Sequence, residues 1–279
     1  MNFRLLALAS ALFLSQGTAG EVPENFRREN LIAWCIVPFD AAKRGPAERA
    51  TMVKALGMRR VAYDWRKEHI PTFEAELQAY RNAGIEMTAF WSGHEDAYPL
   101  FRQFEIRPQI WKTLPSNEAP TQEGKVIKAA EMMAALAAKC MENRLTLGLY
   151  NHGGWGGEPA NLVAVCRELR RRGFVDVGIV YNFHHAHERI DSWAEDLELI
   201  KPYLICLNLN GMVKDGPEEG RKILTIGKGD HEQEMIKTVV VSGYDGPIGI
   251  LDHRNETDTE ETVRENIEGL EAIFKQARE

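Results

Sequence analysis

The sequence has little of what defines several large protein classes. It has 4 cysteines in 279 residues and no CxxC pair, which argues against a cysteine-rich metal site or a disulfide-stapled scaffold. No stretch after the N-terminal segment approaches 18 uninterrupted apolar residues, so no membrane-spanning helix is predicted there. The net charge is −7 and the one clustered basic run is 170–172, so no nucleic-acid surface is predicted. With 44% hydrophobic residues, the composition is that of an ordinary soluble chain.

The first twenty residues have the order of a secretory signal peptide. A short basic start, Met1 to Arg4, precedes the apolar run Leu5–Leu14 and the small residues Thr18-Ala19-Gly20. Cleavage near Gly20 would leave a mature chain of residues 21–279, so a secreted or periplasmic location is expected. Export permits disulfides, but the cysteines lie on predicted strands and helices. Most are expected to be buried free thiols, with a Cys140–Cys166 pair left open.

From residue 31 onward, short runs rich in β-branched and aromatic residues alternate with longer amphipathic stretches, which indicates repeated βα units. Several of the runs are continuously apolar, as buried parallel strands are. The eight predicted strands are Leu31–Phe39, Arg60–Trp65, Glu86–Trp91, Gln109–Leu114, Leu145–Tyr150, Val175–Tyr181, Tyr203–Leu209 and Pro247–Leu251.

Helical patterns lie between these strands, notably 125–141 and 158–172. Gly57, Gly84 and Gly173 each follow a helical stretch, where a left-handed glycine often ends a helix. Eight βα units in about 250 residues predict one α/β domain, a single (β/α)8 TIM barrel over residues 21–279. A doubly wound open sheet is the alternative. No GxGxxG follows the first strand, so no nucleotide cofactor is expected.

The eight histidines all follow predicted strands, on the face that carries catalytic residues in such barrels. A functional role is favoured for His152, His185 and His253, whereas a structural role is favoured for His69, His187 and His231. Tryptophans gather at the same strand ends, and flat apolar rings beside hydrogen-bonding groups suit a sugar. A small-molecule carbohydrate is therefore the expected partner.

Four segments together resemble the xylose isomerase-like TIM barrels, the sugar phosphate isomerase/epimerase group. They are 149–155 (LYNHGGW), 178–185 (GIVYNFHH), 207–211 (LNLNG), and the pair 227–230 (GKGD) with 243–252 (GYDGPIGILD). The last pair, a GxG segment followed by a GYxG strand that ends in an acid, is the most specific.

The resemblance implies proton transfer beside a sugar carbonyl, assisted by a divalent metal bound at the ends of strands five to eight. By position, the metal-binding slots fall at Asn151 or His152, at Asn182 near His185, at Asn208 and at Asp252. Asparagine is a poor replacement for carboxylate or imidazole at a transition-metal site. Two alternatives stay open: a rebuilt Mn, Zn, Mg or Fe site, or a metal-free sugar pocket. The rebuilt site would use His152, Glu158, His185 and Asp252.

Other polar residues on this face include Asp64, Glu95, Lys112 and Arg254. Glu95 and Glu158 are the preferred general acid or base, together with His152 and His185. Lys228, between two glycines, is a candidate phosphate contact. The candidate substrate-binding residues are Trp65, Trp91, Lys112, Asn151, Trp155, Asn182, Asn208, Asn210 and Arg254.

The sequence therefore predicts an exported enzyme that moves protons next to a sugar carbonyl, by isomerisation, epimerisation or elimination. Two alternatives belong to other classes. One is a non-catalytic carbohydrate-binding protein, suggested by the asparagines in the metal slots. The other is a glycoside hydrolase, which would require Glu95 and Glu158 to face each other at roughly 5 to 10 Å.

Overall fold

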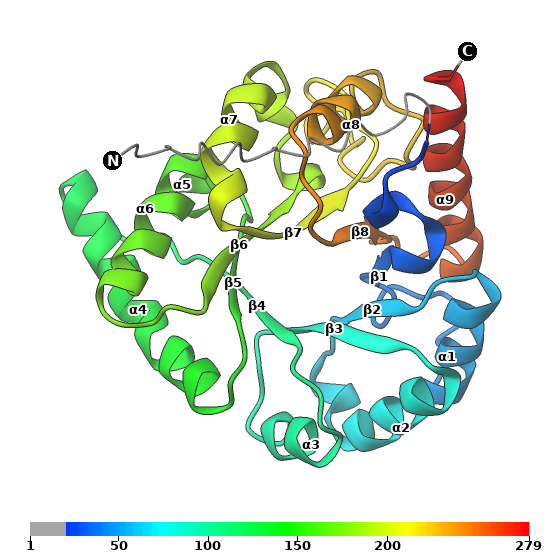
Figure 1. Ribbon diagram of the computed structural model, residues 1–279, viewed down its shortest axis with the longest axis horizontal. Helices are drawn as coiled ribbons and strands as arrows, with labels where there is room; N and C mark the ends of the chain where they lie inside the picture. The colour runs from blue at the N-terminus through cyan, green and yellow to red at the C-terminus, as the bar shows by residue number, and fades with distance from the viewer. Residues whose placement is uncertain (1–20, 279) are drawn as a thin grey trace, which may run out of the picture.

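The computed structural model describes residues 21–278 and shows a closed barrel of eight parallel strands in sequence order, surrounded by helices (Figure 1). The expected signal segment, residues 1–20, lies outside the described residues. No helix in the described part of the chain is both long and apolar enough to span a membrane. The strands are β1 (Ile32–Trp34), β2 (Arg60–Tyr63), β3 (Glu86–Trp91), β4 (Gln109–Thr113), β5 (Leu147–Tyr150), β6 (Val177–Asn182), β7 (Leu204–Leu209) and β8 (Ile248–Leu251).

Helices lie between successive strands and form the outer ring in Figure 1. The α-helices are α1 (Pro46–Ala55), α2 (Phe73–Ala83), α3 (Ala97–Gln103), α4 (Gln122–Glu142), α5 (Gly154–Gly157), α6 (Pro159–Arg171), α7 (Trp193–Ile200), α8 (Glu232–Val241) and α9 (Thr259–Gln276). Short 3-10 helices are η1 (Glu24–Phe26), η2 (Arg28–Asn30), η3 (Lys67–Thr72), η4 (Phe183–His185), η5 (His187–Ser192) and η6 (Lys201–Tyr203).

Two buried clusters divide the side chains of each strand. The larger lies between strands and helices; on β6 it takes Val177, Ile179 and Tyr181. The smaller fills the barrel and takes Val180 from the same strand. This alternation follows from the two-residue period of a strand, and it determines which residues point into the barrel.

The predicted TIM barrel is confirmed, and the doubly wound sheet is wrong because β1 pairs with β8. Several strands are shorter than predicted. β1 ends at Trp34 because Cys35 has a φ of +60°, a left-handed conformation that breaks the strand five residues early. The predicted helix ends are correct, since Gly57, Gly84 and Gly173 all have positive φ.

The four cysteines are buried free thiols, so the Cys140–Cys166 disulfide left open by the sequence is not formed. Each of the two thiols has a pKa raised by burial, to about 12 for Cys140 and about 11 for Cys166.

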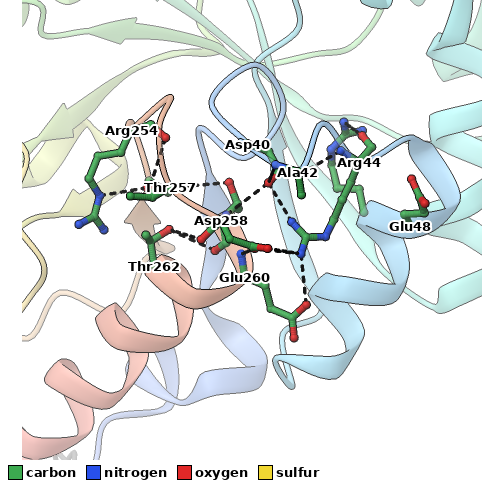
Figure 2. Close-up of polar contacts among 12 residues, drawn as sticks. Asp40, Ala42, Arg44, Glu48, Arg254, Thr257, Asp258, Glu260 and Thr262 are labelled. Atoms are coloured by element: carbon green, nitrogen blue, oxygen red, sulfur yellow. Dashed lines mark hydrogen bonds and ion pairs between the residues drawn. The ribbon is translucent and has the colours of Figure 1, made fainter.

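A polar network joins the first βα loop to the last (Figure 2). The fully buried carboxylate of Asp40 accepts hydrogen bonds from the Ala42 and Arg44 backbone amides and pairs with the Arg44 guanidinium at 2.8 Å. Arg44 also reaches Asp258, the N-cap of α9, at 2.9 Å, and Glu260 at 3.5 Å. The network therefore fixes the loops after β1 and β8 to each other across the point where the barrel closes.

Candidate active site

Aromatic rings fill the carboxyl-terminal half of the barrel interior. Trp34 lies against Trp111 and Trp91, with ring centroids 4.9 and 5.7 Å away. Tyr150 packs edge-on against Trp91 at 5.1 Å, and its hydroxyl accepts a hydrogen bond from the Trp34 indole. Trp91 is half-buried, so one ring of this aromatic floor is partly exposed, and its predicted contact with a substrate stays a prediction.

Two asparagines lie directly above the aromatic floor, on neighbouring strands. Asn182 donates from Nδ2 to the Tyr150 hydroxyl at 2.5 Å. Asn208, in register with Asn182, is fully buried, and its Nδ2 has no hydrogen-bond partner within residues 21–278. Gly249 leaves room for it, because a Cβ there would overlap Asn208 Oδ1. Asn208 therefore has a buried donor that is available to a ligand, and its predicted role in substrate binding stays a prediction.

Four imidazoles form a continuous row at the strand ends: His152 after β5, His184 and His185 after β6, and His253 after β8. We call this row the histidine arc. Ring centroids are 4.2 Å apart for His152 and His185, 3.6 Å for His185 and His184, and 5.8 Å for His184 and His253.

All four imidazoles of the histidine arc have lowered pKa values. Burial is the largest cause in each, and the nearby ammonium of Lys222 contributes to each. The pKa falls to about 2 for His185 and to about 4 for His253, and that of His184 lies well below the usual value. The arc is therefore uncharged near neutral pH.

His184 is arranged as a base. Its Nδ1 lies 2.7 Å from Asn182 Oδ1, which also accepts the His184 backbone amide. Since an amide oxygen only accepts, Nδ1 carries the proton and Nε2 holds a lone pair. This Nε2 is buried and has no partner in the described structure, while the whole residue is 2% exposed. A free imidazole lone pair inside a barrel is suited to take a proton from a ligand.

Asp64 provides a carboxyl group from the opposite side of the barrel, since β2 and β6 are opposite in an eight-stranded ring. Its Oδ1 accepts the Val37 amide at 3.2 Å, whereas Oδ2 is buried without a partner among residues 21–278. Burial raises the pKa of Asp64 to about 7. The buried thiol of Cys35 lies beside it, and burial followed by the Asp64 charge raises the pKa of that thiol well above its usual value.

Asp252, at the end of β8, is fully buried and bound within the protein. Its Oδ2 accepts from the Thr259 hydroxyl at 2.9 Å, and its Oδ1 lies 3.4 Å from Arg254 Nε. Burial raises its pKa to about 6 against the opposing effect of these partners. Arg254 also reaches the Thr225 hydroxyl, so it is held beside Asp252.

The two carboxylates that the sequence favoured as catalytic are not brought together. Glu95 is 76% exposed and pairs with Lys139 near the end of α4, because the loop after β3 turns outward. Glu158 is the N-cap residue of α6 and pairs with Arg189 at 3.4 Å. Each is a surface ion-pair partner, so the predicted catalytic roles and the paired-carboxylate geometry of a glycoside hydrolase are not supported.

Three of the predicted substrate contacts point away from the barrel interior. Trp65 packs against Phe73, and its indole donates to the Trp91 carbonyl. Lys112 shares the outer face of β4 with Ile110 and donates to Ser92. Trp155 donates to Gln122 at the start of α4 and packs on the outer core. For Lys112, the two-residue period of β4 places the side chain on the helix side.

Two of the predicted asparagines hold backbone instead of a ligand. Asn151 donates to the Asn182 carbonyl and accepts its amide at 2.7 Å. Asn210 fixes the β7–α8 loop through the Lys222 carbonyl and the Leu224 amide. His187 supports the same loop, because both its ring nitrogens face carbonyl oxygens, those of Val213 and Lys222.

The GxG segment near Lys228 is also structural. Its amides, at Gly227 and Gly229, donate to the buried carboxylate of Glu232 at 2.9 and 2.8 Å, and that carboxylate also accepts the Met212 amide. The backbone groups that a phosphate would use are therefore occupied by Glu232, which corrects the phosphate role considered for Lys228.

The model of the xylose isomerase-like TIM barrel family matches residues 56–273. The chain belongs to this family. The strands and loops that carry the histidine arc, Asn208 and Asp64 all fall inside the matched range, whereas β1 with Trp34 and Cys35 precedes it.

Solved structures with the family's fold are similar over nearly their whole length. An L-ribulose 3-epimerase is 11% identical with a TM-score of 0.67, covering 89% of this chain and 95% of that one. The 3-keto-D-glucoside 4-epimerase of E. coli is 12% identical with a TM-score of 0.64, covering 87% and 98%. The IolI protein with a bound zinc atom is 9% identical with a TM-score of 0.67, covering 88% and 98%. At such identities the likeness establishes the fold. No curated protein matches this sequence.

The family's divalent metal does not fit the residues present here. Of the rebuilt set, Glu158 is engaged by Arg189, and both oxygens of Asp252 have partners in Thr259 and Arg254. His152 and His185 touch each other without a third ligand, and nowhere in residues 21–278 are three His, Cys, Asp or Glu side chains placed to hold a metal ion. Two of the four slots that would bind the metal hold Asn182 and Asn208, and a neutral amide is a poor ligand for a transition metal.

Proposed function

We propose that this protein is a sugar isomerase/epimerase-like enzyme that moves a proton on the carbon next to a carbonyl. The supporting observation is a pair of buried atoms without partners in the described residues, His184 Nε2 and Asp64 Oδ2, which follow the opposite strands β6 and β2. One is a lone pair and the other belongs to a carboxyl group that holds its proton up to about pH 7. Family membership and the sugar epimerases of the same fold agree with this assignment.

In this mechanism His184 takes the carbon-bound proton while Asp64 donates its proton to the carbonyl oxygen. The product is a neutral enediol, which forms without a free enediolate charge because the acid and the base act together. Asn208 Nδ2 donates a hydrogen bond to a substrate oxygen, and the open ring of Trp91 contacts the apolar face of the sugar. Return of the proton from His184 to the neighbouring carbon, with transfer of the hydroxyl proton of the first carbon to Asp64, isomerises the sugar. Epimerisation at the first carbon additionally requires a proton donor on the opposite face of that carbon.

The side chains around this pair support the transfer by their fixed positions. Asn182 holds the His184 tautomer, since its Oδ1 accepts from Nδ1. The Val37 amide holds the other oxygen of Asp64. Ile223, on the β7–α8 loop, packs against the interior cluster and shields the strand ends from water.

The test is exchange of carbon-bound hydrogen in D2O, followed by NMR on a panel of ketohexoses, aldoses, uronic acids and 3-keto-glucosides. The wild type should incorporate deuterium next to the carbonyl. His184→Gln and Asp64→Asn, which keep shape, should each lower the rate about 10²- to 10⁴-fold. His94→Gln and Glu95→Gln, on the outward-turned loop, are the matched controls and should stay within about twofold, since neither residue enters the proton transfer.

Saturable sugar binding without deuterium incorporation would contradict the enzyme and support the carbohydrate-binding protein instead. Equal rates in the His184 and Asp64 variants and in the controls would remove the assigned acid and base.

The proposal places this chemistry outside the cytoplasm, because residues 1–20 have the order of a signal peptide. Expression of the full chain in a bacterial host should yield a mature protein in the periplasm or medium whose N-terminal sequence begins near Glu21. An unprocessed chain retained in the cytoplasm would contradict export.

A further inference from the structure

We propose that the substrate is an acid, a polyhydroxy carboxylate such as a uronic acid, and that Arg66 binds its carboxylate. This inference rests on the proposed function and specifies the substrate class of the same site.

Arg66 is held at the edge of the candidate site by one half of its guanidinium. Nη1 donates to the carbonyls of Asp64 and Trp65 at 2.6 and 3.0 Å. The guanidinium carbon lies 5.3 Å from the centroid of the Phe39 ring. That ring contacts His253 in a tilted arrangement, with centroids 3.8 Å apart. Since His253 is the last member of the histidine arc, Arg66 is connected to the assigned base through two ring contacts.

The other half of this guanidinium is free to bind a ligand. Within residues 21–278 no carboxylate lies within 4.0 Å of Arg66, and Nε and Nη2 have no hydrogen-bond partner. Other half-buried arginines in the strand-end loops have acidic partners: Arg44 binds Asp40, and Arg254 binds Asp252. The Nε–Nη2 edge presents two parallel N–H donors, the geometry that matches a carboxylate.

Space for a ligand lies next to this position. A cavity of about 670 Å³ is lined mainly by residues of the β1–α1 loop and η3. Two of the lining residues, His69 and Val37, contact Arg66 and Asp64. His69 Nδ1 accepts the Arg66 amide, and the Val37 amide donates to Asp64. A ligand that extends from this cavity toward Asp64 would therefore pass Arg66, because Val37 and His69 line the cavity and contact Asp64 and Arg66.

The local charge also favours an anion. Lys222, the cation near all four imidazoles of the histidine arc, has no carboxylate within 4.0 Å in the described structure, and the imidazoles are neutral. Asp64 and Asp252 have raised pKa values, so their combined negative charge is reduced near neutral pH. In a chain of net charge −7, Arg66 and Lys222 are thus both without a carboxylate within 4.0 Å among residues 21–278.

A carboxylate fits better than a phosphate ester. A phosphate is commonly held by several backbone amides, and the amides of the GxG segment are taken by Glu232. The donors that remain are Nε and Nη2 on the planar edge of the Arg66 guanidinium, and this edge pairs with the two oxygens of a carboxylate.

The test compares matched pairs by isothermal titration calorimetry and by the D2O exchange assay: glucuronate with glucose, and galacturonate with galactose. Glucose 6-phosphate and glucose 6-sulfate are added as ester anions. The wild type should bind at least one uronate about tenfold or more tightly than its neutral partner. Arg66→Met should weaken uronate binding about 10- to 100-fold and leave the neutral sugar within about twofold. Arg107→Met, an exposed arginine on the α3–β4 loop, is the matched control.

Binding of the neutral sugars as tight as that of the uronates, or no uronate binding, overturns the inference. If the phosphate or sulfate ester binds more tightly than either uronate, and Arg66→Met loses this binding, the ligand of Arg66 is an ester anion and not a carboxylate. If both members of a pair exchange deuterium equally in wild type and in Arg66→Met, the acid specificity fails while the proposed proton transfer stands. Uronate-selective binding lost in Arg66→Met, without any exchange, supports the anion site and contradicts the enzyme.

Discussion

Replacing Asp64 with asparagine should stabilise the protein increasingly as the pH rises. The folded-state pKa of Asp64 is about 7 against a usual 3.8, so the folded protein binds this proton more tightly than the unfolded chain does. The favourable contribution is complete below about pH 4 and is lost as the pH rises through about 7. At roughly 1.4 kcal/mol per unit of pKa shift, the full contribution to the free energy of unfolding is about 4 kcal/mol. About 2–3 kcal/mol of this contribution is lost between pH 5 and pH 8.

Urea unfolding followed by tryptophan fluorescence at several pH values from 5 to 8.5 measures this difference. Buried histidines change the pH dependence of both proteins, but their contributions cancel when Asp64→Asn is compared with wild type at each pH. Asp191→Asn is the control, because Asp191 is 80% exposed and pairs with Lys214 at the surface. If the difference in unfolding free energy between Asp64→Asn and wild type stays constant from pH 5 to 8, Asp64 ionises normally. That result would refute its role as the acid.

Three further results are expected. The deuterium-exchange rate of the wild type should fall above about pH 7 as Asp64 loses its proton, and a rate that keeps rising to pH 9 would contradict this. Gly249→Ala should lower the unfolding free energy by about 1–3 kcal/mol and slow exchange, because its methyl group overlaps buried Asn208; unchanged urea midpoints would contradict the packing. Glu232→Gln should cost about 1–3 kcal/mol in urea unfolding and leave exchange at 20 °C within about threefold, because the carboxylate binds backbone amides outside the site.

The fold was predictable because its signals are local and repeated. Each continuous apolar run marked a buried strand, and glycines such as Gly57 and Gly84 marked helix ends through their positive φ. The end of β1 was not predictable in this way. Cys35 adopts a left-handed conformation within an apolar run, and nothing in residues 31–39 marks that position as a turn.

The site was only partly predictable, because order along the chain does not give the direction of a loop. Glu95 and Asp64 both follow strands, yet the loop of Glu95 turns outward to Lys139 while Asp64 points inward. Strand parity indicates the direction of Asp64, which is two residues after the interior residue Ala62. It does not indicate the direction of His184, which lies in η4 after the end of β6. The cations Arg66 and Lys222 lie in loops without a period, so only the folded structure shows their place.

Burial raises the pKa of the acid and lowers the pKa of the base in this site. These opposite shifts give each group the protonation state that the proposed proton transfer requires. A low-polarity interior disfavours every charged form, so it keeps the proton on Asp64 and off His184. Near neutral pH the loop after β2 therefore carries a carboxyl group that is at least partly protonated, and the loop after the opposite strand β6 carries an unprotonated imidazole. This is the state that donates to a carbonyl oxygen while accepting from the adjacent carbon. In the folded protein at pH 8, Asp64 is largely ionised in an environment that opposes its charge. The fall in stability and the fall in exchange rate above pH 7 therefore have one physical cause. Neither pH-dependent fall should occur in Asp64→Asn, whose exchange is slow at every pH.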